Sequence, residues 1–205
     1  MKGSGHGSVL SRQDFYAITK VGEQSGVIAP SESKIIDNLL KFSSVRAKDI
    51  MTPRTVVNAS KQDMTIGEFY EDNKKLRFSR VPIYTDSKDN ITGYIMKDDI
   101  LSAMIENKDK KTLKDVMREI TIVTENMNIQ AIFDKLIADK EHIALVVDEF
   151  GGMSGILTQE DVIETLLGME IVDEFDKDED MQQLARKVWQ KRAKELGLNQ
   201  EDNAE

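Results

Sequence analysis

HIALVVDEFGGMSGILTQEDVIETLLG, from His142 to Gly168, contains the pattern of a strand, a tight turn, a second strand and a helix. The apolar run Ile143–Asp148 is typical of a buried strand. Phe150-Gly151-Gly152 is typical of a turn. Gly155-Ile156-Leu157 predicts a second strand, and the helix is expected to begin near Gln159.

Thr158 and Asp161 stand three residues apart where the second strand gives way to the helix. They fit a capping box, with Thr158 as the N-cap and Asp161 at the third helical position. They also fit a ligand site, because a carboxylate can accept from both hydroxyls of a ribose and a helix N-terminus favours a phosphate. The motif alone leaves both interpretations open.

The composition excludes several classes of function. The chain has 205 residues, of which 40% are hydrophobic and 32% charged, as in soluble globular proteins. Its net charge of −9 argues against nucleic-acid binding. Without cysteine there is no disulfide or thiolate metal site, and the two histidines lie far apart in the sequence. No apolar run approaches the ~18 residues of a membrane span, and no signal peptide is visible.

Two helices are expected before the main domain. Ser11–Gln24 begins with a capping-box pattern and is followed by Gly26, which favours helix termination. Pro30-Ser31 opens a second helix with an apolar stripe, which we expect to cover the domain that follows. The members of the stripe are Ile35, Ile36, Leu39, Leu40 and Phe42.

The chain from Val45 to Gly168 contains an internal repeat. Lys48-Asp49-Ile50-Met51 recurs as Lys114-Asp115-Val116-Met117. Gly93–Ile100 (GYIMKDDI) recurs as Gly155–Val162 (GILTQEDV).

Each copy predicts the order strand, helix, strand, strand, helix. The first internal helix has a capping box at Thr65 and Glu68, and the second has a cap at Asn128. Such a unit exposes one apolar face of a small sheet, so two copies are expected to pack sheet to sheet. The predicted fold is therefore α/β (α+β), with two pseudo-symmetric repeats and flanking helices. Its symmetry predicts two equivalent clefts, which are common ligand sites.

The paired repeats resemble a tandem CBS-domain, or Bateman, module. More specifically, VRAKDIMTPR (Val45–Arg54), DEFGGMSGILT (Asp148–Thr158) and EIVDEFD (Glu170–Asp176) are similar to CorC/CNNM-type, hemolysin-C-like membrane proteins. The resemblance extends from about Leu10 to Leu198. It implies a cytosolic CBS pair attached to an N-terminal membrane domain implicated in magnesium and cobalt transport. That domain and the C-terminal flavin-fold-like domain of many members are not found in this sequence, so we expect a cytosolic fragment.

The resemblance implies that the module binds an adenine nucleotide, either AMP or ATP, with Mg²⁺ as a further candidate. Thr158 and Asp161 would hold the ribose and phosphate, and Ile156 would form a wall of the adenine pocket. Glu160 would lie beside the phosphates, where a carboxylate needs Mg²⁺ or a basic side chain nearby.

The first repeat is expected to complete this nucleotide site. Thr52, Pro53 and Val56 would close the purine pocket. His142 and Arg80 are candidates for basic residues that face the phosphates. Alternatively, His142 is an ordinary surface or core histidine, and Arg80 pairs with the acidic surface.

The first repeat departs from the nucleotide pattern at its own site. Met96 stands where the second repeat has Thr158, and a thioether cannot donate a hydrogen bond. Asp99 is retained, so a weak site stays open. We expect one good site, formed by the second repeat's Thr158 and Asp161 with the first repeat's Thr52–Val56.

The C-terminal region is expected to be an acidic stretch followed by a helix. The carboxylates of Glu170–Asp180 fit either a solvated linker or a Mg²⁺-collecting segment. Met181–Leu196 predicts a helix whose Trp189 would dock on the body or on a second subunit. The expected divisions are a linker or cloning remnant (1–10), a helical segment (11–44), the repeats (45–108 and 109–170) and the C-terminal part (171–205).

No enzyme chemistry is predicted. The sequence offers no Ser-His-Asp arrangement and no GxxxxGK[ST] motif, and adjacent Asp148 and Glu149 would point to opposite faces of a strand. No catalytic residue or protein-held metal site is proposed. The expected function is a nucleotide-binding regulatory module that forms a homodimer and controls a membrane domain at the cytoplasmic side of the membrane. Two alternatives are a purely structural dimerisation module and the regulatory half of a metabolic enzyme.

Overall fold

The computed structural model describes residues 10–74, 78–169 and 181–195. The first repeat contains α3 (Ala47–Ile50), β1 (Thr52–Pro53), β2 (Ser60–Lys61), α4 (Ile66–Asp72), β3 (Arg80–Tyr84), β4 (Ile91–Met96) and α5 (Lys97–Ile105). The second contains η1 (Leu113–Val116), β5 (Thr121–Thr124), α6 (Ile129–Asp139), β6 (Ile143–Val147), β7 (Met153–Thr158) and α7 (Gln159–Leu167). The predicted order is confirmed with two differences: a short helix, α3 or η1, precedes each repeat's first strand, and the leading strand of the first repeat is divided into β1 and β2.

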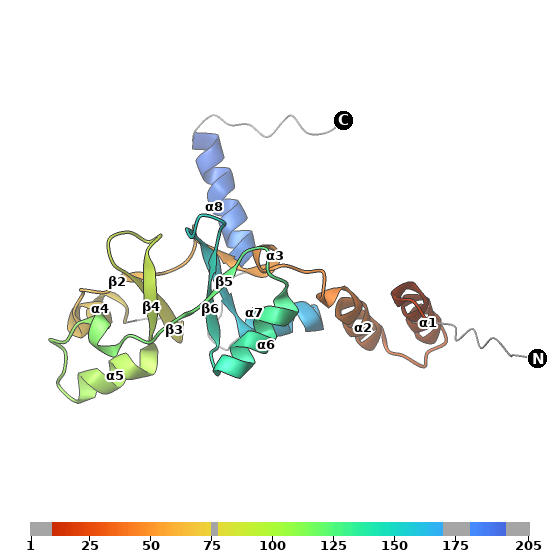
Figure 1. The fold of residues 1–205 in the computed structure, drawn as a ribbon, viewed down its shortest axis with the longest axis horizontal. Helices are drawn as coiled ribbons and strands as arrows, with labels where there is room; N and C mark the ends of the chain where they lie inside the picture. The colour runs from red at the N-terminus through yellow and green to blue at the C-terminus, as the bar shows by residue number, and fades with distance from the viewer. Residues whose placement is uncertain (1–9, 75–77, 170–180, 196–205) are drawn as a thin grey trace, which may run out of the picture.

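The strands form two sheets, which lie side by side in Figure 1. One sheet has the order β1-β7-β6-β5 and the other has the order β2-β3-β4. Within each repeat the last two strands are antiparallel, and the strand before the internal helix is parallel to the strand after it. A crossover helix is the usual connection between parallel neighbours, which explains the positions of α4 and α6.

Each repeat also contributes its leading segment to the sheet of the other. Strand β1 of the first repeat pairs with β7, with Thr52 opposite Ile156. In the same way, Arg118 of the second repeat forms a bridge with Tyr94 of β4. Glycines allow both close approaches: a Cβ on Gly155 would lie 2.4 Å from the Thr52 carbonyl oxygen, and one on Gly93 would lie 2.4 Å from that of Arg118.

The apolar core has three parts. One lies between the four-stranded sheet and its helices and includes Leu136 and Val162, and a second lies between the three-stranded sheet and its helices and includes Phe69 and Ile100. The third part lies between the two sheets. Its buried members are Tyr94, Ile143, Leu145, Met153 and Ile156. This third cluster confirms that the repeats pack sheet to sheet.

Helices α1 (Arg12–Gln24) and α2 (Pro30–Phe42) form a hairpin at one end of the molecule (Figure 1). The capping box at Ser11 is present, and Gly26 adopts a positive φ of 76° just after the helix. The expectation for the apolar stripe of α2 is only partly correct. Phe42 packs against the second-repeat core, but Leu39 is 58% exposed, because α2 contacts the body mainly along α7.

Helix α8 (Met181–Glu195) begins beside β1. The side-chain amide of Gln182 donates to the carbonyl oxygen of Asp49 at 2.9 Å. Trp189 is half exposed, and the acidic stretch Glu170–Asp180 lies outside the described residues. Among the helices that the structure describes, none combines the length and apolar character needed to cross a bilayer.

Candidate functional site

The candidate site is built around the end of β7 and the start of α7, and we call it the second-repeat site. Thr158 is the N-cap of α7, and its hydroxyl donates to Oδ2 of Asp161 at 2.8 Å. The Asp161 carboxylate also accepts from the Thr158 backbone N–H at 2.6 Å, and the Asp161 N–H donates back to the Thr158 hydroxyl at 3.2 Å. The predicted capping box is therefore confirmed. Both side chains remain half-buried, so the box does not remove them from the surface.

The first turn of α7 offers a ligand fewer N–H groups than its sequence suggests. The Gln159 N–H donates to the carbonyl oxygen of His142, and the Asp161 N–H is used in the capping box. The N–H of Glu160 is therefore the donor of this turn that a ligand phosphate would meet. The Glu160 side chain is exposed, and its place beside a phosphate stays a prediction.

Pairing of β1 with β7 brings together three of the predicted pocket residues. Thr52 lies opposite Ile156, and Pro53 lies opposite Gly155. Ile156 is 6% exposed in the core between the sheets and shares a face of β7 with Thr158, two residues further on. Val56 follows in a turn, where its N–H donates to the carbonyl oxygen of Pro53 at 3.0 Å. One edge of the join thus contains the apolar side chain of Ile156, the Thr158 hydroxyl and the Asp161 carboxylate, which accepts hydrogen bonds. This combination is chemically compatible with a nucleoside.

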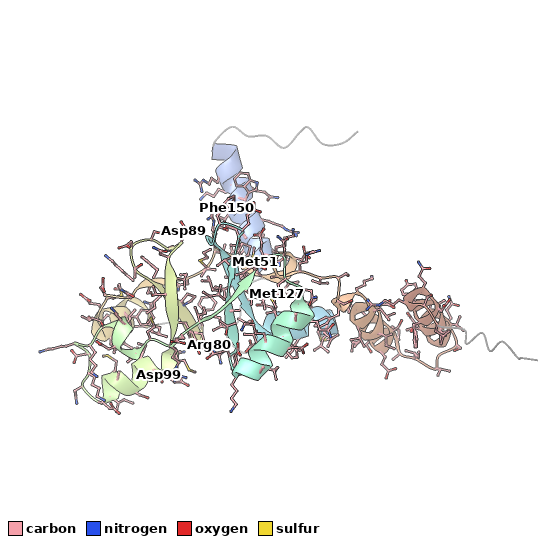
Figure 2. All side chains as sticks on the ribbon, viewed as in Figure 1. Met51, Arg80, Asp89, Asp99, Met127 and Phe150 are labelled. Atoms are coloured by element: carbon pink, nitrogen blue, oxygen red, sulfur yellow. The ribbon has the colours of Figure 1, made fainter. Side chains whose placement is uncertain are left out.

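The two predicted basic residues come from different sheets. His142 is exposed and precedes β6, whose first residue lies opposite Thr158. Arg80 begins β3, opposite Met96, and Figure 2 shows it at the edge where the two sheets meet. His142 is therefore next to the second-repeat site in the same sheet, whereas Arg80 approaches from the facing sheet.

A hydrogen bond links the repeats beside these basic residues. The hydroxyl of Tyr94 donates to the carboxylate of Glu141 at 2.8 Å. Burial is the main cause that raises the pKa of Tyr94, and the bond to Glu141 raises that pKa further. The positive charges of Arg118 and Arg80 act in the opposite direction and lower the pKa of Tyr94.

Sequence reasoning missed Arg118. Its Nε and Nη2 donate to Oδ2 of Asp99 at 3.0 and 2.8 Å. The ion pair raises the pKa of Arg118, chiefly through the hydrogen bond to Asp99. The internal repeat could have identified it, because Arg118 follows Met117 as Thr52 follows Met51. Arg118 is therefore the counterpart of the predicted site residue Thr52.

Asp148 and Glu149 do not form a paired-carboxylate site. The Asp148 carboxylate accepts from the N–H groups of Phe150 and Gly152, at 2.9 and 2.8 Å. It therefore holds the turn between β6 and β7, whose tip exposes Phe150 (Figure 2).

Neither a cluster of metal ligands nor a suitable pocket indicates a second candidate site among the described residues. Within the described ranges, no group of three or more His, Asp or Glu residues is placed to hold a metal ion. A surface pocket of about 600 Å³ lies on the first repeat, beside Lys61, Glu68 and Glu71. It contains none of the predicted nucleotide-site residues and is mostly acidic, so it does not suit an anionic ligand.

Comparison with known families matches both repeats. The family model for the CBS domain matches residues 47–106 and 113–168. The matched ranges contain the elements α3 to α5 and η1 to α7.

Two curated relatives match most of the chain. A UPF0053 protein of Synechocystis sp. is 33% identical over 181 residues, covering 88% of this chain and 52% of the relative. The magnesium and cobalt efflux protein CorC of Escherichia coli (strain K12) is 30% identical over 190 residues, covering 92% of this chain and 65% of the relative. The chain thus spans only about half to two thirds of the length of these proteins.

Solved structures give the same family. The CBS domain of a bacterial CNNM/CorC family Mg²⁺ transporter is 35% identical, with a TM-score of 0.74 over 80% of this chain and 100% of that domain. The structure of a CBS domain of this family in complex with ATP is also 35% identical, with a TM-score of 0.65 over 68% of this chain and 99% of that chain. The chain therefore belongs to the CBS-domain family, as a pair of CBS domains homologous to those of CorC/CNNM transporters.

Proposed function

We propose that this chain is a regulatory CBS pair that binds an adenine nucleotide at the second-repeat site and thereby controls an attached membrane domain. The observation that carries the proposal is the set formed by Thr158, Asp161 and Ile156 beside β1. The ATP complex of a domain that is 35% identical supports the same ligand class and favours ATP over AMP.

In this proposal the ribose hydroxyls donate to the Asp161 carboxylate, which the capping box holds in a fixed orientation. The Thr158 hydroxyl contacts the ribose or the first phosphate. The adenine packs on Ile156 and is closed in by Thr52, Pro53 and Val56. An apolar wall with a few placed polar groups is typical of small-molecule sites.

The phosphates would extend towards Glu160, His142 and Arg80. A triphosphate beside an exposed carboxylate needs positive charge nearby. The chain has a net charge of −9, so its overall electrostatic potential does not attract an anion. We propose that Arg80 and His142 supply part of this charge and that Mg²⁺ bound to the phosphates supplies the rest, since Mg²⁺ usually binds through substrate phosphates and one or two carboxylates.

Helix α7 is the proposed connection to the rest of the parent protein. Its N-terminus contains Thr158 and Asp161, and its C-terminal carbonyl groups accept hydrogen bonds from α2. If α7 can adopt two positions, a ligand with a higher affinity for one of them would shift the equilibrium between the two. The shift is limited to the difference between the two binding free energies. The α1–α2 hairpin would transmit the shift to a membrane domain for Mg²⁺, Co²⁺ or another divalent cation, on the cytoplasmic side of the membrane.

Calorimetric titration with AMP, ADP and ATP, each with and without Mg²⁺, tests the proposal. We expect about one saturable site per chain, tighter for ATP in the presence of Mg²⁺, and loss of that site in a Thr158→Ile variant. An Asn128→Ala variant is the matched control. Asn128 caps α6, which packs on the same sheet as α7, and its side chain accepts from the N–H of Ala131 and not from a residue of the second-repeat site. Absence of binding by the folded wild-type chain under every condition would overturn nucleotide sensing.

The alternative is a module that only dimerises. We propose a homodimer in either case, and size-exclusion chromatography with light scattering tests it directly. A dimer that binds no nucleotide would support the structural role. A monomer with or without ATP would contradict the homodimer for this part of the protein.

A further inference from the structure

The first repeat contains a second set of residues at the positions of the nucleotide site, which we call the first-repeat site. Strand β4 and the start of α5 form it, as β7 and α7 form the second-repeat site. The residues that correspond to Ile156, Thr158 and Asp161 in the second repeat are Tyr94, Met96 and Asp99.

The leading segment of the opposite repeat completes both sites in the same way. Thr52 lies opposite Ile156, and Arg118 forms the corresponding bridge with Tyr94. Both backbone N–H···O bonds of that bridge are present, from the Tyr94 N–H at 3.0 Å and from the Arg118 N–H at 2.8 Å. The position that carries an uncharged hydroxyl in the second-repeat site therefore carries a guanidinium group in the first.

That guanidinium group forms an ion pair with Asp99, the carboxylate that a bound ribose would use. Arg118 donates twice to Oδ2 of Asp99, at 3.0 and 2.8 Å. The side chains of Arg118 and Asp99 are 49% and 34% exposed, so the pair lies where a ligand could reach it. A nucleotide would have to remove a charged donor from Asp99 and replace it with neutral ribose hydroxyls, which form weaker hydrogen bonds to a carboxylate.

Met96 removes the second polar contact of the first-repeat site. A thioether donates no hydrogen bond, so the position of the Thr158 hydroxyl has no counterpart. Tyr94 is 4% exposed and Ile156 is 6% exposed, so at this position both repeats have a side chain that belongs mainly to the core between the sheets.

We propose that Arg118 occupies the first-repeat site in place of a ligand, and that Arg118 and Met96 together limit the CBS pair to one nucleotide. This inference rests on the proposed function, because it assigns to Asp99 the role proposed for Asp161. In this proposal, the difference in ligand binding between the two repeats comes from these two side chains.

The test is a double variant, Met96→Thr with Arg118→Thr, which installs the second-repeat side chains. Calorimetry with ATP and Mg²⁺ is expected to show a rise from one site per chain to two. In a Thr158→Ile background, the double variant is expected to restore one site, and a further Asp99→Asn change is expected to abolish it. Arg118→Lys with Met96→Thr is the control, because lysine retains the charge on Asp99 and should gain no site.

The outcomes separate this inference from the proposed function. If the wild-type chain binds one nucleotide and the folded double variant still binds one, the inference is wrong and the proposed function stands. If the wild-type chain binds none, the proposed function fails. In that case Asp99-dependent binding by the double variant would still support the closing role of Arg118, and its absence would overturn it. Thermal unfolding of each variant verifies that it is folded.

Discussion

At the scale of single residues, Thr158 combines a structural and a proposed binding role. Its hydroxyl and its backbone N–H both donate to Asp161, which fixes the carboxylate and closes the first turn of α7. A capping box satisfies backbone groups that would otherwise be unpaired at a helix start. The same contacts would orient Asp161 towards the proposed nucleotide, so the two interpretations of the sequence motif are compatible.

Variants at Thr158, compared with a variant at the capping residue Thr65, separate these two roles. Thr158→Val removes the hydroxyl, and we expect a loss of about 1 kcal/mol in the free energy of unfolding, together with at least a tenfold loss of nucleotide affinity, about 1.4 kcal/mol. Thr158→Ser should retain both properties. Urea unfolding and calorimetry measure the two effects.

Thr65→Val is the matched control for this series. It breaks the equivalent capping box of α4, in which the Thr65 hydroxyl donates to Glu68 at 2.8 Å. A similar loss of stability with unchanged nucleotide affinity is expected. If Thr65→Val weakened nucleotide binding as much as Thr158→Val, the effect at Thr158 would reflect stability alone.

Gly155 decides whether β1 can reach the second-repeat site. Gly155→Ala would place a Cβ 2.4 Å from the Thr52 carbonyl oxygen and 3.0 Å from Sδ of Met51. We expect a loss of about 1–3 kcal/mol in unfolding free energy, together with weaker nucleotide binding because Thr52 moves away from Ile156. Gly93→Ala is the control, because it creates the same clash with Arg118 at the first-repeat site. Equal loss of nucleotide affinity in both variants would contradict the assignment of β1 to the second-repeat site.

At the scale of secondary-structure elements, α7 connects the candidate site to the helical hairpin. Asn38 of α2 donates to the carbonyl oxygen of Leu166 at 3.2 Å, and Lys34 donates to that of Gly168. These bonds satisfy carbonyl groups at the end of α7, which its own backbone cannot pair. A lysine near a helix C-terminus is also favourable to the helix dipole.

Loss of these contacts should loosen α2 without unfolding the CBS pair. For Asn38→Ala with Lys34→Ala we expect faster hydrogen exchange in α1 and α2 and little change in β6 and β7. Each hydrogen bond contributes about 0.5–1.5 kcal/mol. Lys41→Ala, an exposed substitution on the same helix, is the control and should leave exchange unchanged. Unchanged exchange in the double variant would show that apolar packing alone holds α2 on α7.

At the scale of the whole molecule, the join between the two sheets determines which residues can form a common site. Tyr94 and Ile156 lie in one apolar cluster, although they belong to different repeats. The hydroxyl of Tyr94 also reaches Glu141, beside the second-repeat site. The join thus consists of apolar packing with a polar bond at its edge.

Tyr94→Phe tests the contribution of that bond. The hydroxyl is buried and donates to a carboxylate, so we expect a loss of about 1.5–3 kcal/mol in unfolding free energy, measured by urea denaturation. Tyr84→Phe at the far end of β3 is the control, since the structure gives its hydroxyl no hydrogen bond within the described residues. If the two variants lost equal stability, the bond between Tyr94 and Glu141 would contribute nothing specific to the join.

The amino-acid sequence by itself determined the repeat, the order of the elements and the helix caps. These are local properties, since periodicity and capping depend on residues within a few positions of each other. It also identified Thr158 and Asp161 as a pair at the start of a helix, and the resemblance to CBS pairs added Ile156 to them.

The family resemblance implied that Thr52–Val56 lies at the second-repeat site, but only the tertiary structure decided where the leading segment of the second repeat lies. The exchange of β1 and Arg118 between the repeats depends on contacts between residues far apart in the chain, made possible by Gly155 and Gly93. For that reason the ion pair between Arg118 and Asp99 was not predicted, although both residues have counterparts at the second-repeat site. The position of α2 on α7 likewise depends on hydrogen bonds across the fold, which no local pattern specifies.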